Sequence, residues 1–221
     1  RKKKTITVGT KIKGFYYFDD LLKTKKNTEN YKMNIKLINE IFIIASTSGS
    51  TGNPKPIVLT QKTKLLRSKY TIKAYGLNSK SVIITSTPLY HTLAQRLVLI
   101  SLIVGGTSVI MPGFSNKKWV KDVIKNKVTF SILVSSQLEN LISFKKNIFK
   151  KLKSLKTVVA SSSKLHENVR KKIYSIKKPN IYEIYGTSEI AAVTNMKINK
   201  DSDKINSVGK PISIASVKII D

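Results

Sequence analysis

A loop rich in hydroxyl groups and glycines could hold a polyphosphate. It reads Thr47-Ser48-Gly49-Ser50-Thr51-Gly52-Asn53-Pro54-Lys55 and joins two apolar runs, residues 41–45 and 57–60. Both runs predict strands, the first of them buried. Glycines let a backbone approach an anion closely, and successive N–H groups form a concave nest of partial positive charge. Hydroxyl groups add donors and Lys55 adds a full charge, so the loop suits phosphate groups.

The loop differs from the Walker pattern of P-loop NTPases, which requires Gly-Lys where this chain has Pro54-Lys55. An ordinary polar turn is the alternative, since Ser, Gly, Asn and Pro are common turn residues. A second string, Tyr185-Gly186-Thr187-Ser188-Glu189, follows a predicted short strand at residues 180–184. A tyrosine ring offers a flat apolar face, a serine hydroxyl can donate to an oxyanion, and a carboxylate is a hard ligand for Mg²⁺. For Glu189 alone, a solvated surface acid is the alternative.

Together the two strings resemble the adenylate-forming superfamily of acyl-CoA synthetases, aryl-CoA ligases and amino-acid adenylation domains. The first resembles its phosphate loop, with Pro56 where glycine is usual, and the second its Y-G-x-T-E motif, with Ser188 for threonine. The resemblance implies that residues 47–52 and Lys55 bind the β- and γ-phosphates of ATP. It further implies that the segment of Tyr185, Gly186 and Thr187 holds the nucleotide, with the Tyr185 ring on adenine. Ser188 would meet the α-phosphate and Glu189 would bind Mg²⁺.

Three shorter strings support the resemblance. Pro88-Leu89-Tyr90-His91 resembles the P-L-[FY]-H segment of acyl- and aryl-CoA ligases, and Ser207-Val208-Gly209-Lys210-Pro211 resembles a V-G-x-P turn. Ser161-Ser162-Ser163-Lys164-Leu165 stands where the family has an adenine-contacting stretch, so Ser162 and Ser163 are implied neighbours of adenine. The resemblance gives His91 a role in the acid site, with a structural histidine as the alternative. His166 has no motif around it and is interpreted as a surface residue at a helix start.

The implied activity has two steps. A carboxylate oxygen attacks the α-phosphorus of ATP and releases pyrophosphate, and a thiol, usually that of CoA, then attacks the acyl-adenylate. Adenylation is needed because oxide is a poor leaving group and AMP is a good one, and the enzyme acts by positioning and charge neutralisation. Amino-acid adenylation domains carry an aspartate near the position of Tyr90, which this chain lacks, so a small-molecule acyl or aryl acid is favoured. An amino-acid adenylation domain remains the alternative.

The elements that must position these residues alternate along the chain. Strands are predicted at residues 81–85, 107–110, 129–134 and 157–160. Helices are predicted at residues 61–75 with Thr60 as cap, 93–104, 117–125, 136–144 and 165–176. Such alternation predicts an α/β fold with largely parallel sheets flanked by helices. Ligands bind beyond the carboxyl ends of such strands. The phosphate loop, His91, the Ser161 segment and Tyr185 each follow a predicted strand, so we expect one shared site.

Residues 1–40 are interpreted as a lysine- and asparagine-rich lead-in with a short helix near residues 18–22, and residues 41–221 as the nucleotide-binding core. The chain starts with Arg1 and ends before the family's ribose-binding aspartate and its small C-terminal domain, whose lysine serves adenylation. We therefore expect a fragment of a cytoplasmic enzyme that is inactive alone.

The net charge of +29 raises nucleic acid or an anionic membrane as partners. However, lysines outnumber arginines 37 to 4, are spread along the chain and do not alternate with aromatics. Bias toward A/T-rich codons explains this composition, so specific nucleic-acid binding is the distant alternative. The chain has no cysteine, which excludes disulfides and a cysteine nucleophile. Its longest apolar stretch, residues 97–104, is too short to span a bilayer, and peripheral membrane contact stays open.

Overall fold

The structure, a computed structural model, describes residues 6–7, 10–23, 38–46, 55–145, 147–200 and 207–220. The chain divides into two units, Arg1–Ile35 and Lys36–Asp221. Residues 47–54, which include all of the predicted phosphate loop except Lys55, lie outside the described residues.

The described residues of the smaller unit form three short elements. Strand β1 (Ile6–Thr7) pairs in parallel with β2 (Tyr16–Tyr17), and helix α1 (Phe18–Leu22) follows directly. Helix α1 confirms the helix expected near residues 18–22. Lys11 Nζ lies 2.8 Å from Asp20 Oδ2, an exposed ion pair that joins the loop after β1 to this helix.

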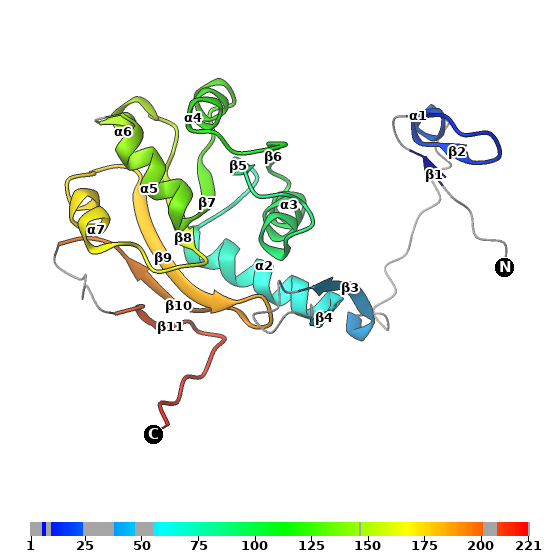
Figure 1. Cartoon of the computed structure of the whole chain (residues 1–221). Coiled ribbons are helices and arrows are strands. Elements are labelled where there is room, and N and C mark those ends of the chain that lie inside the picture. The colour runs from blue at the N-terminus through cyan, green and yellow to red at the C-terminus, as the bar shows by residue number, and fades with distance from the viewer. Residues whose placement is uncertain are drawn as a thin grey trace. The chain divides into compact units, whose positions relative to one another are not determined.

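The larger unit alternates strands and helices, as the pattern of residues predicts (Figure 1). In chain order they are β3 (Ile41–Ser46), β4 (Pro56–Thr60), α2 (Gln61–Tyr75), β5 (Val82–Thr85), α3 (Thr92–Val104), β6 (Thr107–Ile110), α4 (Asn116–Lys125), β7 (Phe130–Val134), α5 (Ser135–Phe144), α6 (Ile148–Lys151), β8 (Thr157–Ser161), α7 (Glu167–Ile173), β9 (Asn180–Thr187), β10 (Ala191–Lys197) and β11 (Lys210–Pro211).

Seven strands form one sheet in the order β11-β10-β9-β8-β7-β5-β6. The five strands from β9 to β6 are parallel to their neighbours, and β10 and β11 add an antiparallel edge. The predicted α/β fold with a largely parallel sheet is confirmed. The chain runs from β5 outward to β6 and then returns past β5 to β7, so the strand order reverses between β5 and β7. Such reversals create the crevices in which open α/β sheets bind ligands.

Two apolar cores pack on the sheet. One joins α3 and α2 to the strands through side chains such as Leu97, Ile100 and Tyr75. The other joins α4, α5, α6 and α7 to the strands and contains Trp119 and Leu138, both fully buried. Helices on both faces bury the central strands, which explains the continuous apolar runs in β7 and β8.

Local sequence cues set the limits of helix α2. The Thr60 hydroxyl accepts a hydrogen bond from the Thr63 amide at 3.2 Å, and Gly76 ends the helix at φ 62°. The helix therefore spans residues 61–75, as predicted from its cap. Helix α3 likewise ends at Gly105, with φ 67°.

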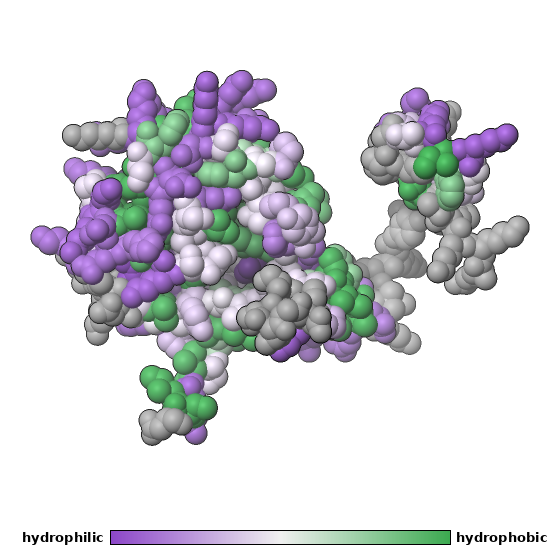
Figure 2. All heavy atoms as spheres, in the orientation of Figure 1, coloured by the Kyte–Doolittle hydropathy of each residue, from purple (hydrophilic) through white to green (hydrophobic). Residues whose placement is uncertain are grey.

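The hairpin of β3 and β4 corrects one expectation. Residues 41–45 were expected to form a buried strand, yet Ile41, Phe42 and Ile44 are each more than half exposed. The reason is that β3 pairs only with β4, antiparallel, and neither strand joins the seven-stranded sheet. Apolar atoms consequently show at the surface over this hairpin in Figure 2.

Helix α3 is buried on one side only, since Leu102 is 74% exposed, and Ile124 of α4 faces solvent. Some limits of elements differ from the predictions. Helix α7 is shorter than predicted, and β9 runs three residues past Ile184, because a second strand, β10, pairs with it. Strand β10 is not anticipated from the sequence. No helix formed by the described residues is long and apolar enough to cross a membrane.

Candidate nucleotide and acid site

The Tyr185 to Glu189 segment turns the chain from β9 into β10. Thr187 pairs with Ala191 and Gly186 with Ala192, so Tyr185, Gly186 and Thr187 lie within β9 and do not follow it as expected. A Cβ on Gly186 would lie 1.5 Å from the Ala191 carbonyl oxygen. Glycine is therefore required here by the close approach of the two strands. The Tyr185 ring is 53% exposed and thus accessible to a ligand.

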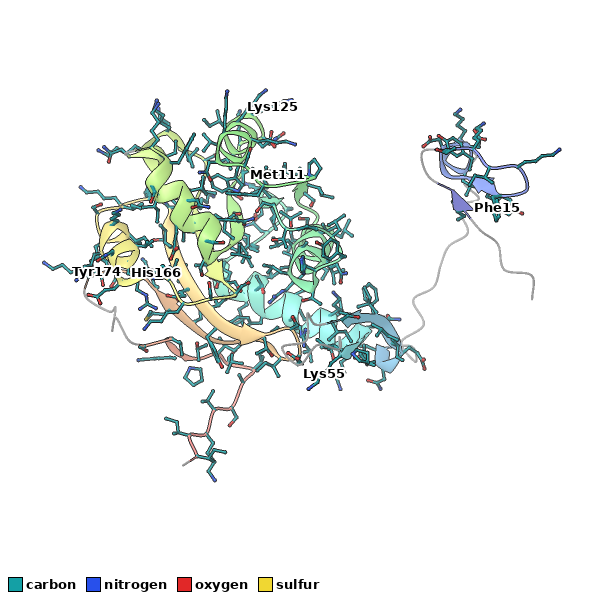
Figure 3. All side chains as sticks on the ribbon, in the orientation of Figure 1. Phe15, Lys55, Met111, Lys125, His166 and Tyr174 are labelled. Atoms are coloured by element: carbon teal, nitrogen blue, oxygen red, sulfur yellow. The ribbon has the colours of Figure 1, made fainter. Side chains whose placement is uncertain are left out.

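Glu189 lies exposed at the tip of this turn. A hydrogen bond from the Thr187 side chain, a backbone hydrogen bond and the charges of Lys55 and Arg67 lower the pKa of its carboxyl group. Lys55 begins the segment that enters β4, as labelled in Figure 3. The structure thus brings together two residues that the sequence analysis assigned to one site, although they are far apart in the chain. The β3–β4 hairpin does so from outside the main sheet, not from the end of a parallel strand.

The side chain of Arg67 in α2 binds the backbone of the turn. Its Nη1 donates to the Ser188 carbonyl oxygen at 3.1 Å, and its Nη2 donates to the Glu189 carbonyl oxygen. A planar guanidinium suits two such bonds because its donors are fixed in a fork. The sequence analysis missed Arg67. A cue existed, since arginine occurs only 4 times among 41 basic residues.

A small pocket opens beside the turn. It is lined by Lys64 and Arg67 of α2, Thr92 and Arg96 of α3, and Thr187 and Ala191 of β9 and β10, and it encloses about 20 Å³. Lys64 is only 3% exposed. Its Nζ donates to Gln95 Oε1 at 2.7 Å and lies 5.8 Å from the centre of the Phe42 ring.

The three cations of this pocket affect one another. Burial, with the charges of Arg96 and Arg67, lowers the pKa of Lys64 to about 8. Burial and the charge of Arg67 lower the pKa of Arg96 to about 10. Depressed pKa values of this kind mean that positive charge is desolvated without sufficient compensation. Among the described residues that line the pocket there is no acidic side chain, and Glu189 acts on Arg67 from the turn.

His91 occupies the N-cap position of α3, makes no side-chain capping bond and is exposed. Its ring centre lies 4.4 Å from that of Tyr90, which is 75% exposed, and its amide donates to the Pro88 carbonyl oxygen at 3.0 Å. The next residue, Thr92, lines the pocket. The structure therefore places the His91 segment beside the same pocket, after the carboxyl end of β5.

Ser162 and Ser163 follow β8 and are both exposed. Ser162 adopts φ 82°, a region that favours glycine, and the Ser163 carbonyl oxygen accepts from the Ser135 hydroxyl. Strand β8 pairs with β9, so this segment emerges beside the strand that carries Tyr185. A shared position near one ligand thus agrees with the topology.

A buried ion pair connects the segments that follow β8 and precede β11 to strand β9. Arg170 Nη2 donates to Glu183 Oε2, and the two side chains are 0% and 4% exposed. Glu183 Oε1 also accepts from the Leu165 amide at 3.0 Å, while Arg170 donates to the Ser207 carbonyl oxygen at 3.2 Å. The pair thereby ties the segment after β8 and the segment before β11 to β9. The sequence analysis missed it as well.

His166 is confirmed as an exposed residue at a helix start, the N-cap of α7. Its amide donates to Glu139 Oε1 at 3.0 Å. Figure 3 shows His166 beside α7 and Lys55 beside the hairpin, on different sides of the larger unit. His166 is thus not part of the group around Glu189.

Comparisons with known proteins show the family of the chain. The model of the family of AMP-binding enzymes matches residues 2–221. Among curated proteins, the chain is 26% identical over 180 residues to an indoleacetate–CoA ligase of Aromatoleum aromaticum, covering 80% of this chain and 35% of that protein. It is 24% identical over 217 residues to a 2-succinylbenzoate–CoA ligase of Staphylococcus epidermidis, covering 96% and 44%.

Solved structures show the same fold. The O-succinylbenzoate coenzyme A synthetase of Bacillus subtilis, in complex with AMP, superposes with a TM-score of 0.77 at 19% identity, over 90% of this chain and 41% of that one. A long-chain-fatty-acid CoA ligase-like protein of Rhodopseudomonas palustris gives a TM-score of 0.75 at 22% identity, over 94% and 50%. The chain spans less than half the length of the two curated relatives.

Proposed function

The chain belongs to the family of AMP-binding enzymes, and on this premise we propose that it carries the nucleotide-binding core of an acid–thiol ligase. The proposed reaction is activation of a carboxylic acid by ATP, followed by transfer of the acyl group to a thiol, that of CoA being our choice. The curated relatives above are CoA ligases, which supports this choice.

One observation carries the proposal. Glu189, an ionised carboxylate, stands on a turn that Arg67 fixes by two backbone hydrogen bonds, and Lys55 lies within electrostatic reach. An anionic oxygen ligand and a cation placed side by side are what a magnesium–polyphosphate requires. Within the described residues no group of three or more His, Asp or Glu side chains could hold a metal alone. A Mg²⁺ that takes most of its ligands from phosphates and water fits a single carboxylate.

The remaining roles follow from position. The exposed Tyr185 ring would pack on adenine, with Ser162 and Ser163 on the adjacent strand end, and Ser188 would donate to the α-phosphate. Residues 47–52 remain the predicted phosphate loop, and Gly186 and Thr187 shape the turn. Magnesium would neutralise phosphate charge when bound. The protein's own part is to hold the acid and nucleotide in line and to exclude misplaced water.

The acid would lie near His91, after β5. The Pro88 to His91 segment carries no carboxylate, so a substrate ammonium group lacks a partner there. This supports an acyl or aryl acid over an amino acid. A location in the cytoplasm stays a prediction.

The test is acid-dependent release of pyrophosphate from Mg-ATP. The longest open reading frame that contains this chain would be assayed with a panel of fatty, aryl and amino acids. We expect release with at least one acyl or aryl acid. Glu189→Gln should lower the rate by roughly 10²–10³-fold because a preorganised charge is lost. Glu167→Gln, an exposed acid of α7, is the control and should leave the rate unchanged. Release driven only by amino acids, or by no acid, would overturn the proposal.

A further inference from the structure

The three cations around the small pocket have donors to spare. The Lys64 ammonium gives one of its three N–H groups to Gln95. Arg96 lines the pocket, and no hydrogen bond or ion pair joins its guanidinium to another described residue. Arg67 donates to the carbonyl oxygens of Ser188 and Glu189. The nucleotide roles proposed above use neither Lys64 nor Arg96.

Such a cluster is unfavourable without an anion. Like charges in a desolvated site repel, and the lowered pKa values of Lys64 and Arg96 report that repulsion and the burial. The other lining residues, Thr92, Thr187 and Ala191, carry no negative charge. Thr92 instead adds a hydroxyl donor, whereas the Thr187 hydroxyl donates to the Glu189 carboxyl group. The chemistry of the lining thus matches an oxyanion.

The position of the pocket narrows the choice of anion. The pocket is partly open, and its accessible space of about 20 Å³ admits an oxygen atom of a larger ligand. A flat carboxylate can accept with both oxygens from a guanidinium fork. The pocket adjoins the segment of His91, where the acid was placed above, and this favours a carboxylate of the acid over a phosphate.

We propose that Lys64 and Arg96, with Arg67, form a subsite for a second carboxylate on the acid substrate. The substrate class would then be acids with two carboxyl groups, one to be activated and one held in this pocket. This inference rests on the proposed function for the identity of the ligand as a substrate. Binding of the carboxylate itself can be measured without any reaction.

The first experiment is calorimetric titration of the 221-residue chain, without ATP, at pH 7. Monocarboxylic acids and α,ω-dicarboxylic acids of equal carbon number are compared over a range of lengths. We expect at least one dicarboxylic acid to bind roughly 10-fold or more tightly than its matched monocarboxylic acid, since charge-assisted hydrogen bonds are gained. Equal binding across all pairs would overturn the proposal.

Substitutions in the pocket test whether it causes the preference for dicarboxylic acids. Arg96→Gln and Lys64→Met should each abolish it, and Lys64→Arg should retain most of it. Lys73→Met is the matched control, since Lys73 lies exposed on the same helix α2, and it should keep the preference. Circular dichroism melting shows that each variant is folded. A preference that survives both Arg96→Gln and Lys64→Met would refute the subsite.

A phosphate group is the other source of an oxyanion. If the two variants weaken binding of inorganic pyrophosphate while dicarboxylic and monocarboxylic acids bind alike, the pocket serves phosphate and the inference fails. The proposed function is judged separately, by acid-dependent pyrophosphate release. Release driven equally by matched monocarboxylic acids leaves the function standing and refutes the subsite. A dicarboxylate preference without release by any acid refutes the function and leaves the carboxylate pocket.

Discussion

Among the described residues of the larger unit, two buried groups of positive charge differ in how they are compensated. Arg170 packs against Glu183, and both are also bonded to backbone groups of neighbouring segments. Lys64, also buried, faces Arg67 and Arg96 across a pocket whose described lining residues include no acid. A buried cation that is paired with an anion of the same chain holds segments of the fold together. A buried cation without such an anion lowers stability, and we expect it to be retained where an anionic ligand binds.

The largest effect is expected at the compensated pair. Glu183→Ala should lower the free energy of unfolding by about 3–5 kcal/mol, because it leaves the Arg170 charge buried and unpaired. Urea denaturation measures the loss. Glu167→Ala removes an exposed ion pair with Lys171 and serves as control, with little change expected. Equal effects of the two substitutions would mean that the buried pair does not hold these segments together.

Thr187 and Ala191, which line the pocket without an acid, belong to the paired ends of β9 and β10. Gly186→Ala should lower the free energy of unfolding by about 1–3 kcal/mol, since the new methyl group meets the Ala191 carbonyl oxygen. Gly113→Ala is the control, because a Cβ there meets nothing within 4 Å. Thermal melting of both variants provides the measurement. A melting temperature for Gly186→Ala equal to that of the control would show that the turn can open without loss.

Removing the buried Lys64 charge should raise the free energy of unfolding, opposite to the two substitutions above. Lys64→Met keeps the apolar stem of the side chain and deletes the ammonium group, so the free energy of unfolding should rise by about 1 kcal/mol. Lys73→Met, on the exposed side of α2, should change little. If Lys64→Met proves less stable than the unmodified chain, then the bond to Gln95 outweighs the repulsion and the contrast between the two regions fails.

The stability difference between the unmodified chain and Lys64→Met should also depend on pH. The folded pKa of Lys64 is lowered from 10.5 to about 8. Between these values the unfolded chain binds more protons at this residue, so the contribution of Lys64 to the free energy of unfolding becomes more favourable as pH rises from 8 to 10.5. The difference between the unmodified chain and Lys64→Met should therefore shrink over this range. Other groups also titrate in this pH range, but their contributions cancel when the two proteins are compared. A constant difference would contradict the shifted pKa.

These two regions also show what the sequence could predict. Local cues sufficed for α2, whose cap Thr60 and terminal Gly76 set its limits, and for the alternation that gives the parallel sheet. They failed for the hairpin, because whether β3 joins the main sheet is decided by long-range pairing. Arg67 contacts Ser188 across 121 positions, and the pocket joins four elements, so no local pattern reveals either. The phosphate loop at residues 47–54 and the roles of the site residues remain predictions.

Rare residue types would have helped. In a chain with 37 lysines and 4 arginines, the arginines of the larger unit stand where the geometry of a guanidinium matters. Arg67 and Arg96 line the pocket, and Arg170 forms the buried pair. Sequence analysis of lysine-rich chains should therefore weigh each arginine separately.

The pocket beside the turn between β9 and β10 is proposed to hold uncompensated positive charge. The pKa of Lys64 tests it directly, by NMR titration of the chain with lysine labelled at the ε-carbon and the signal assigned by its loss in Lys64→Met. We predict a pKa of about 8 in the free chain, rising when a dicarboxylic acid is bound. If the Lys64 signal titrates with those of the exposed lysines, with or without the acid, the pocket does not hold uncompensated charge.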